Sequence, residues 1–472
     1  MSATTSKIGI IGLAAMGANL ARNFADKKIP VTVYNRTREK TAEFIKNHGN
    51  EYLYSADTLE QFTASLEKPR KILLMVKSGV AIDEMIAELT PFMEKNDILI
   101  DMGNSHYRDT EARINQTSER FSFTGCGISG GEEGALKGPS LMFGGSEYEW
   151  EIMKPFLEKI SAEDFSGNPC VTLLGPNGSG HYVKMVHNGI EYAIMQTIAE
   201  AYQILSLIFS MPAPQIGQIF STFNKSKLNS FLYEITAAVL KKPDDTDSGY
   251  LVDKILDKAE QKGTGMWTVM DAMERGIQVP TIAQAVISRI ISGDKIKREK
   301  ISKKYSARLQ RENLNLDDFI HILDDALFSA MICSFAQGIE LLEKASADNN
   351  WNLNIPEVLR IWQGGCIIRA SQLKTLEKCF REHAKSPETH VFELPESVSN
   401  LKGNISNLRK VIEISIRNSI PVPALSSVLA YFDGMTQKRS GANLIQALRD
   451  AFGAHTYERI DRPGTFSSEW LS

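Results

Sequence analysis

The sequence contains few cysteines, and none of them pairs in a way that suggests a metal or redox site. Its 472 residues include five. These are Cys126, Cys170, Cys333, Cys366 and Cys379. None belongs to a CxxC pair or a zinc-ligand pattern. An odd number of scattered thiols is typical of a reduced, intracellular protein. We therefore expect no metal site and a cytoplasmic location.

Charge excess and long apolar runs are also missing. Lysine and arginine total 53 and the acidic residues 57, so the formal net charge is −4. This balance excludes a general polyanion binder, so any phosphate site must be built locally. Residues 1–7 lack the apolar core of a signal peptide. Even the apolar run 192–211 contains Gln196, Glu200 and Gln203, which argues against a membrane span. We expect a soluble protein that binds neither membrane nor nucleic acid.

Two patterns divide the chain. Between residues 7 and 177, β-rich runs alternate with amphipathic stretches, which predicts a doubly wound parallel sheet. The expected strands are 7–11, 31–34, 71–76, 97–101, 121–125 and 171–174, and the stretches between them include 16–26, 39–46, 82–92 and 148–160. Beyond residue 178, the helical period dominates in 180–209, 253–256, 282–292, 316–345, 355–374 and 398–418.

This pattern predicts a Rossmann-like α/β domain at residues 1–178, a large all-α domain at 179–438 and a C-terminal tail at 439–472. The segments that begin at Ala199 and Ala336 are weakly similar, at an offset of about 137 residues. We therefore expect an internal duplication within the helical domain.

A glycine-rich turn follows the first expected strand. Gly12, Ala14 and Gly17 form the GxAxxG variant of the dinucleotide-binding fingerprint, which brings a helix N-terminus to a pyrophosphate. NAD enzymes usually place an acidic residue after the second strand, whereas this chain has Arg36 there. A guanidinium can bind a 2′-phosphate, so the turn predicts NADP. A plain tight turn and a surface arginine are the alternatives.

One predicted helix carries five polar side chains on a single face. Lys184, His187, Asn188, Glu191 and Tyr192 stand at i, i+3, i+4, i+7 and i+8. Such a face is ordinarily solvated, but the intervening residues are apolar and the helix directly follows the nucleotide-binding domain. The lysine and the carboxylate lie about 10 Å apart along the axis, so they can act on opposite ends of a small substrate.

The segment "GHYVKMVHNGIEY" resembles the active-site helix of the 6-phosphogluconate dehydrogenase family. "GISGGEEGALKGPS", "QKGTG", "GGCIIRA" and "FGAHTYERID" resemble further motifs of that family in the same order, so the resemblance covers the chain from the first strand to the tail. It implies oxidative decarboxylation of 6-phospho-D-gluconate to D-ribulose 5-phosphate and CO₂ in the pentose phosphate pathway. It also implies NADP as the coenzyme, no metal, and a homodimer with shared active sites.

The resemblance implies a role for each matching position. Lys184 would be the base that takes the proton of the C3 hydroxyl, and Glu191 the acid that protonates C1 after decarboxylation. The residues implied to line the coenzyme are Gly12, Leu13, Ala14, Ala15, Met16, Gly17, Asn35, Arg36, Thr37, Val76, Lys77, Ser78 and Asn104. Those implied to hold the substrate are Asn104, Ser129, Gly130, Gly131, His187, Asn188, Tyr192, Lys262, Arg289, Arg449 and His455. The last two belong to the tail, which would complete the site of the partner subunit.

Two other functions remain open. A β-hydroxyacid dehydrogenase would share the glycine turn and the lysine helix, but it lacks the second helical unit and the "FGAHTY" tail. A catalytically silent NADP-binding sensor would be favoured by loss of Lys184 or Glu191, and both are present. We interpret Cys366 as a packing residue and His181 as structural. The chain departs from residues common in the family at Ala15, Met102, His106, Phe143, Met266 and Ala451.

Overall fold

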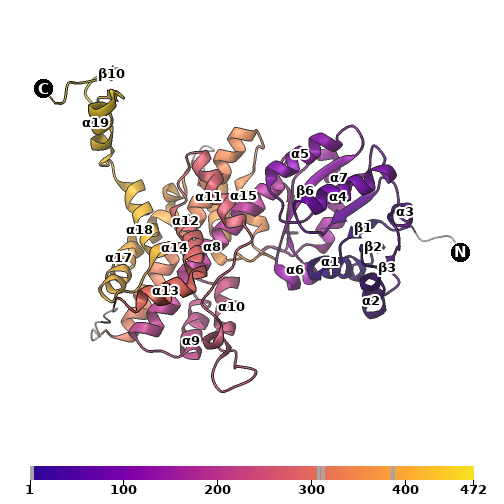
Figure 1. The fold of residues 1–472 in the computed structure, drawn as a ribbon, viewed down its shortest axis with the longest axis horizontal. Helices are drawn as coiled ribbons and strands as arrows, with labels where there is room; N and C mark the ends of the chain where they lie inside the picture. The colour runs from indigo at the N-terminus through magenta and orange to yellow at the C-terminus, as the bar shows by residue number, and fades with distance from the viewer. Residues whose placement is uncertain (1–4, 306–308, 310–313, 384–388, 472) are drawn as a thin grey trace.

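An eight-stranded sheet forms the N-terminal part of the computed structural model, which describes residues 5–305, 309, 314–383 and 389–471 (Figure 1). The start of the N-terminal stretch, residues 1–4, lies outside the described residues. The strand order is β3-β2-β1-β4-β5-β6-β7-β8. The strands are β1 (Ile8–Ile11), β2 (Val31–Tyr34), β3 (Leu53–Ser55), β4 (Lys71–Leu74), β5 (Ile98–Asp101), β6 (Ser122–Ser129), β7 (Ser140–Phe143) and β8 (Val171–Leu173). The helices around them are α1 (Ala15–Asp26), α2 (Arg38–His48), α3 (Leu59–Ala64), α4 (Val80–Leu89), α5 (Tyr107–Thr117), α6 (Gly131–Lys137) and α7 (Glu147–Ile160).

The expected doubly wound sheet is confirmed, but one strand pair departs from the parallel arrangement, because β6 and β7 run antiparallel. A parallel return needs a crossover of a dozen or more residues. Only the short helix α6 and its flanking turns separate these two strands, so the chain reverses direction instead. The pattern also missed β3 and β7, which have three and four residues.

Long helices build the second domain. They are α8 (Ser179–Ile208), α9 (Ala213–Phe223), α10 (Phe231–Val239), α11 (Thr264–Glu274), α12 (Pro280–Gly293), α13 (Lys295–Ser302), α14 (Leu316–Asn349), α15 (Ile355–Ile361), α16 (Ser371–His383), α17 (Pro395–Arg417) and α18 (Pro423–Thr436). The expected helix 355–374 is instead the two helices α15 and α16, because Gly365 takes a positive φ of 59° between them. Only the first half of the expected segment 253–256 lies in a helical turn, the 3₁₀ helix Leu251–Lys254.

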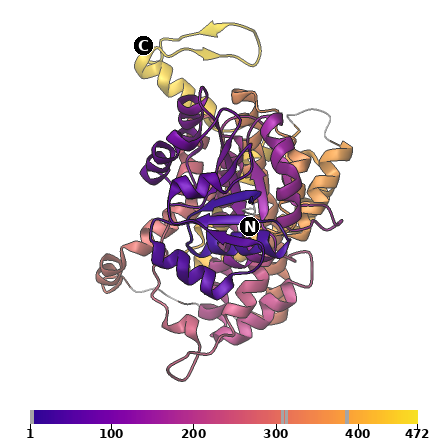
Figure 2. The ribbon, with the colours of Figure 1, turned by 90° about the vertical axis from the view of Figure 1, so that its right-hand side faces the viewer.

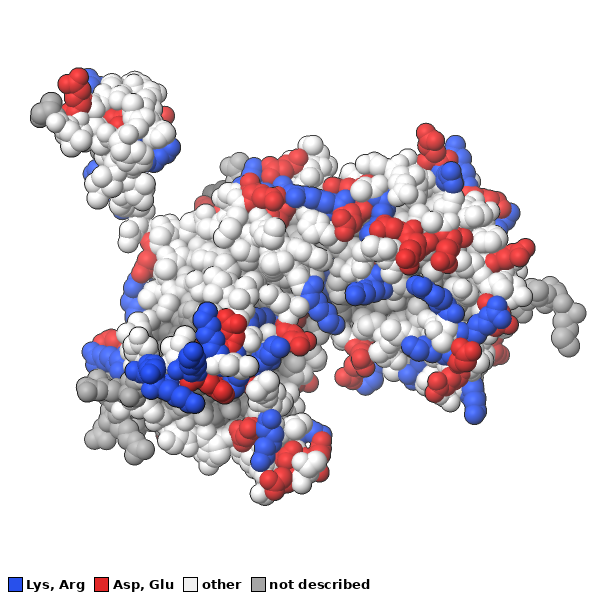
Figure 3. Space-filling view, in the orientation of Figure 1, with Lys and Arg blue, Asp and Glu red and all other residues white. Residues whose placement is uncertain are grey.

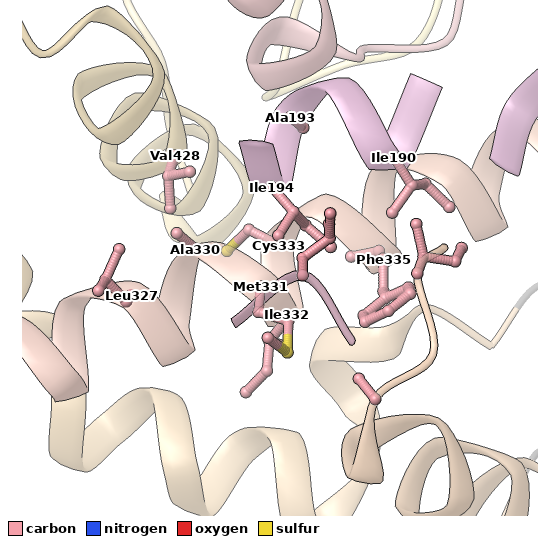
Figure 4. Packing of buried hydrophobic residues seen from close by; sticks show 14 of the residues in the cluster. Ile190, Ala193, Ile194, Leu327, Ala330, Met331, Ile332, Cys333, Phe335 and Val428 are labelled. Carbon is pink, nitrogen blue, oxygen red and sulfur yellow. The ribbon is translucent and has the colours of Figure 1, made fainter. Parts of the chain in front are cut away.

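The core of this domain lies between α8 and α14. Ile194 of α8 lies beside Cys333 of α14, and Ile190 lies farther along on the side of Phe335; all four side chains are buried (Figure 4). Helix α14 is long and apolar enough to cross a membrane by length and composition, a property that the sequence analysis overlooked. Because 72% of its most apolar window is buried inside the protein, α14 has the burial of a core helix.

The internal duplication stays a prediction, and the starts of two helices support it. Helices α12 and α18 both begin with proline, after Val279 and Val422 respectively. The backbone angles of these valines are nearly equal, at φ −126°, ψ 54° and φ −131°, ψ 59°. Helix α12 packs on the long helix α8, and α18 packs on the long helix α14. Both halves of the domain therefore contain a long helix and a later proline-initiated helix that packs on it.

The C-terminal tail stands clear of the helical domain (Figures 1 and 2). It consists of helix α19 (Ala442–Gly453) and a small hairpin of β9 (Tyr457–Glu458) and β10 (Thr465–Phe466). The Asp450 carboxylate organises it by accepting hydrogen bonds from the Thr456 and Ser468 amides and from the Trp470 indole. These donors lower the pKa of Asp450 to about 2, the Trp470 indole contributing most. The tail is therefore a folded unit held by its own contacts.

Candidate active site

The turn between β1 and α1 forms a cradle that fits a pyrophosphate. Gly12 has φ +102°, and a Cβ there would lie 2.5 Å from the Met75 carbonyl oxygen. A Cβ at Gly17 would lie 2.0 Å from the Gly12 carbonyl oxygen, so both positions require glycine. Ala14, the N-cap of α1, provides no side-chain cap. Free amide groups at this helix N-terminus can therefore bind phosphate.

The end of β2 presents the residues expected to select the coenzyme. The Leu13 amide donates to Asn35 Oδ1 over 3.2 Å, and Asn35 Nδ2 donates to the Thr37 carbonyl over 3.2 Å. The Arg36 side chain is 74% exposed, and Glu84 is its ion-pair partner, 3.8 Å away. A guanidinium so weakly held can turn toward a 2′-phosphate, so the residues present fit NADP.

Two further loops lie at the same carboxyl edge of the sheet. Val76, Lys77 and Ser78 follow β4, and Asn104 follows β5 with its side chain exposed. Asp101 shapes the second loop by accepting hydrogen bonds from the Gly103 amide and the Ser105 hydroxyl. Carboxyl ends of neighbouring parallel strands meet at one edge, where doubly wound sheets bind ligands.

Helix α8 carries the two expected catalytic residues and lies against β6. The fit is close, because a Cβ on Gly127 of β6 would lie 2.4 Å from the Lys184 Cβ. Only 6% of Lys184 is exposed. Burial lowers the pKa of its ammonium group, although Glu191 opposes the shift. Burial likewise raises the pKa of Glu191, against the effect of Lys184 and Arg289. Burial therefore favours the uncharged forms of both groups, an amine and a carboxylic acid.

His187 lies at the centre of the polar face and is fully buried. Its Nε2 atom lies 3.1 Å from Ser129 Oγ and 2.8 Å from Cys366 Sγ. Its Nδ1 atom lies 3.0 Å from Asn188 Oδ1 and 3.4 Å from Lys184 Nζ. Burial lowers the pKa of His187 well below its usual value, and Lys184 adds to this. The packing interpretation of Cys366 is incomplete, because the thiol touches a site residue.

Three of the expected phosphate-binding residues come together beyond Glu191. The Arg289 guanidinium carbon lies 3.4 Å from the centre of the Tyr192 ring. Arg289 Nη1 also donates to the Glu260 carbonyl over 3.3 Å, which brings the exposed Lys262 and its loop to the same place. Asn188 Nδ2 donates to Thr264 Oγ1 over 3.2 Å and fastens that loop to α8.

The remaining expected residues differ in position. Gly130 and Gly131 join β6 to α6 beside Ser129. Arg449 and His455 are exposed on the tail, where they contact Gln446 and Phe452. One chain alone does not bring these two residues to the others. Within the described part of the chain, no group of three or more His, Cys, Asp or Glu side chains could hold a metal ion.

His106 and Met266, two positions that the resemblance singles out as unusual, lie near each other. The His106 ring stacks on Tyr107 and meets the edge of Trp267 at 5.2 Å between ring centres. Met266, the neighbour of Trp267, is partly exposed. An aromatic contact therefore connects the Asn104 loop to the start of α11.

A buried carboxylate that the sequence analysis missed also joins these segments. Asp271 accepts hydrogen bonds from the Tyr107 hydroxyl at 2.7 Å, the Tyr182 hydroxyl at 2.5 Å and Arg275 Nε at 2.7 Å. Burial alone would raise the pKa of Asp271, but these donors outweigh it and lower the pKa. Since Tyr107 follows the Asn104 loop and Tyr182 precedes Lys184, Asp271 fixes the two sides of the cleft relative to each other.

We expect Asp271→Asn to lower the free energy of unfolding by about 3 kcal/mol, because it leaves the largely buried Arg275 side chain without the more deeply buried of its two carboxylate partners. Thermal and urea unfolding would measure the loss. Asp348→Asn is the matched control, since Asp348 pairs with the same arginine from a more exposed position and should cost less than about 1 kcal/mol. Equal losses in the two variants would contradict a special role for Asp271.

Comparisons with known proteins agree along the whole chain. The family model for the NAD binding domain of 6-phosphogluconate dehydrogenase matches residues 7–175, and that for the C-terminal domain of the same enzyme matches residues 180–470. The NADP(+)-dependent, decarboxylating 6-phosphogluconate dehydrogenase of Bacillus subtilis is 46% identical over 468 residues, covering 98% of this chain and 99% of the relative. The decarboxylating enzyme of Synechococcus elongatus is 46% identical over 470 residues, with the same coverage.

A solved structure agrees equally well. The Plasmodium falciparum 6-phosphogluconate dehydrogenase, described in its apo form and in complexes with NADP+ and with 6-phosphogluconate, superposes with a TM-score of 0.94 at 43% sequence identity. The match covers 98% of this chain and 100% of that one. The fold therefore extends over the nucleotide-binding domain, the helical domain and the tail.

Proposed function

The chain belongs to the 6-phosphogluconate dehydrogenase family, and we propose that it converts 6-phospho-D-gluconate to D-ribulose 5-phosphate and CO₂ with reduction of NADP. The observation that carries this proposal is the pair on α8. Lys184 and Glu191 are both shifted toward their uncharged forms. In this proposal they act between the dinucleotide cradle at the start of α1 and the cationic side chains of Arg289 and Lys262. A base, an acid, a hydride acceptor and a phosphate site are what this reaction requires.

The two residues divide the proton transfers. Bound NADP supplies a hydride acceptor. The neutral Lys184 amine takes the proton of the C3 hydroxyl, which drives the electron pair of the C3–H bond out as hydride. The Lys184 ammonium then donates a hydrogen bond to the C3 carbonyl oxygen and stabilises the negative charge that develops there as the C1–C2 bond breaks and CO₂ leaves. The protonated Glu191 then delivers a proton to C1 of the enediol product, which is the carbon that was C2 of the substrate.

The other residues orient the sugar acid. Ser129, Gly130, Gly131 and Asn104 offer hydroxyl, amide and carboxamide donors near the reacting end. Arg289 and Lys262 offer two cations, and Tyr192 a hydroxyl, to the phosphate at the other end. Charge-assisted hydrogen bonds hold the phosphate in place, and this positions the reacting carbons of the substrate relative to Lys184 and Glu191.

We also propose that two chains share each active site, with Arg449 and His455 supplied by the partner's tail. The tail exposes a row of apolar side chains on α19, including Leu444, Leu448 and Phe452, the last 75% exposed. The surface of the helical domain below the tail carries few charged side chains (Figure 3). The exposed apolar row on α19 favours association with a second copy. A two-fold arrangement would give two equivalent sites.

The substrate class is tested by comparing 6-phosphogluconate with gluconate. We expect kcat/KM to be at least about 100-fold higher for the phosphorylated acid, because each charge-assisted hydrogen bond contributes roughly 1.5–3 kcal/mol. Comparable values for both acids would favour the β-hydroxyacid dehydrogenase alternative. The proposed setting is a cytoplasmic, soluble homodimer without nucleic-acid or membrane partners.

Arg36→Ala should weaken NADP binding more than NAD binding by about 1.5–3 kcal/mol, since only NADP presents a phosphate to the guanidinium. Coenzyme titrations of the variant and the parent protein would measure this difference. Arg120→Ala is the control, because Arg120 lies just before β6, at the opposite edge of the sheet. If Arg36→Ala weakened both coenzymes equally, the 2′-phosphate assignment would be wrong.

A further inference from the structure

The loop between α15 and α16 brings a thiol to the active-site helix from 179 residues away. Cys366 is buried, and its Sγ atom lies 2.8 Å from His187 Nε2. Burial raises the pKa of the thiol to about 12, an effect only partly opposed by Lys184. Cys366 therefore keeps its hydrogen at neutral pH, and His187 is neutral as well, so a single hydrogen lies between the two atoms.

The other ring nitrogen decides which atom carries that hydrogen. Asn188 donates from Nδ2 to Thr264, so its Oδ1 atom faces His187 Nδ1 at 3.0 Å. An amide oxygen only accepts, so Nδ1 must donate. A neutral imidazole has one N–H group, so Nε2 presents a lone pair. The thiol S–H is then the donor to Nε2.

Ser129 is the competing donor at this lone pair. Its Oγ atom lies 3.1 Å from His187 Nε2 and accepts a hydrogen bond from the Ile367 amide over 3.3 Å. Cys366 and Ile367 are consecutive residues, so one loop both fills the lone pair of His187 and holds the serine oxygen. The hydroxyl hydrogen of Ser129 is thereby left for a ligand in the cleft.

We propose that Cys366 is a positioning residue: its thiol holds His187 in the Nδ1–H tautomer and leaves the Ser129 hydroxyl free to donate to the substrate. This inference rests on the proposed function, in which Ser129 and His187 hold the sugar acid. The role differs from packing because it depends on the S–H donor and not on the volume of the side chain.

Cys366→Ala should raise the KM for 6-phosphogluconate about tenfold, because Ser129 turns to the vacant lone pair and is withdrawn from the substrate. The KM for NADP should stay unchanged. Cys366→Ser supplies an O–H donor at the same place, so its KM for 6-phosphogluconate should return close to that of the parent. Cys333→Ala is the matched control, since Cys333 is a fully buried core thiol on α14 (Figure 4). This substitution removes the same atoms as Cys366→Ala but at a site away from His187.

The tautomer gives a readout that packing does not control. In protein with ¹⁵N-labelled histidine, the His187 signals, identified by their loss in His187→Asn, should show the hydrogen on Nδ1. A hydrogen on Nε2, an unchanged KM in Cys366→Ala, or a Cys366→Ser variant as impaired as Cys366→Ala would each overturn the inference. Ser129→Ala separates this outcome from failure of the site assignment: if it leaves the KM for 6-phosphogluconate unchanged, the proposed substrate contacts are wrong.

Discussion

Lys184→Met should lower kcat for NADPH formation by about 10³-fold, the middle of the range for removal of a general base. Hydride cannot leave C3 until the hydroxyl proton has an acceptor, so CO₂ release should fall equally. Methionine retains the length and apolar stem of lysine, which keeps the packing of α8 on β6. Stopped-flow absorbance with saturating 6-phosphogluconate and NADP would measure the loss.

The pH dependence of the parent enzyme belongs to the same prediction. If Lys184 is the base that we propose, activity requires its free amine, so kcat should rise with pH through the pKa of that lysine, which burial lowers from 10.5. If Glu191 is the proposed acid, activity also requires its protonated form, so kcat should fall through the pKa of Glu191, which burial raises from 4.5. Lys71→Met is the control, because Lys71 is also buried but lies on β4 with Glu67 as its partner. Near-normal hydride transfer in Lys184→Met would exclude it as the base.

Mixed dimers of Lys184→Met and Arg449→Ala chains should regain activity that neither variant has alone. Under the composite-site proposal, Arg449→Ala removes a charge-assisted hydrogen bond to the substrate phosphate. This loss of about 1.5–3 kcal/mol is most visible at substrate concentrations below the KM. If the tail serves the partner, a mixed dimer has one site with both defects and one intact site. Random mixing of equal amounts makes half of the dimers mixed, so about one quarter of the parent activity should return.

Co-refolding or co-expression with two different affinity tags would isolate the mixed dimer. Arg439→Ala provides the matched control, because this arginine lies between α18 and α19, outside the proposed site. The Arg439→Ala chain should be active alone, and mixing it with Lys184→Met chains should rescue no site that lacks Lys184. Mixed dimers that form but regain nothing would show that Arg449 acts within its own chain. The composite-site proposal would then fail, although the assignment of Lys184 would stand.

Local sequence patterns predicted the coenzyme turn and the polar face of α8 because both are short-range. Gly12 and Gly17 have to be glycine for steric reasons that one turn imposes, and the spacing from Lys184 to Glu191 places both on one helix face. The reversal of β7 was missed because a short strand leaves little periodic signal, and its direction depends on the length of the preceding connection.

Local sequence patterns could not predict the contacts between residues that are far apart in the sequence. Cys366 meets His187, and Asp271 meets Tyr107, across more than 150 residues of sequence. Nothing in a buried cysteine or in a helical aspartate indicates its partner until the helices are packed. The placement of Arg449 raises the same difficulty, because its proposed ligand lies on a second chain.

The central claim is that one site couples hydride transfer to decarboxylation. The most direct measurement uses 6-phosphogluconate labelled with ¹³C at C1 and follows NADPH by absorbance and labelled CO₂ by mass spectrometry in the same reaction. The account predicts equal amounts of the two products at all times after the first turnovers. NADPH formed without labelled CO₂, or labelled CO₂ without NADPH, would contradict it.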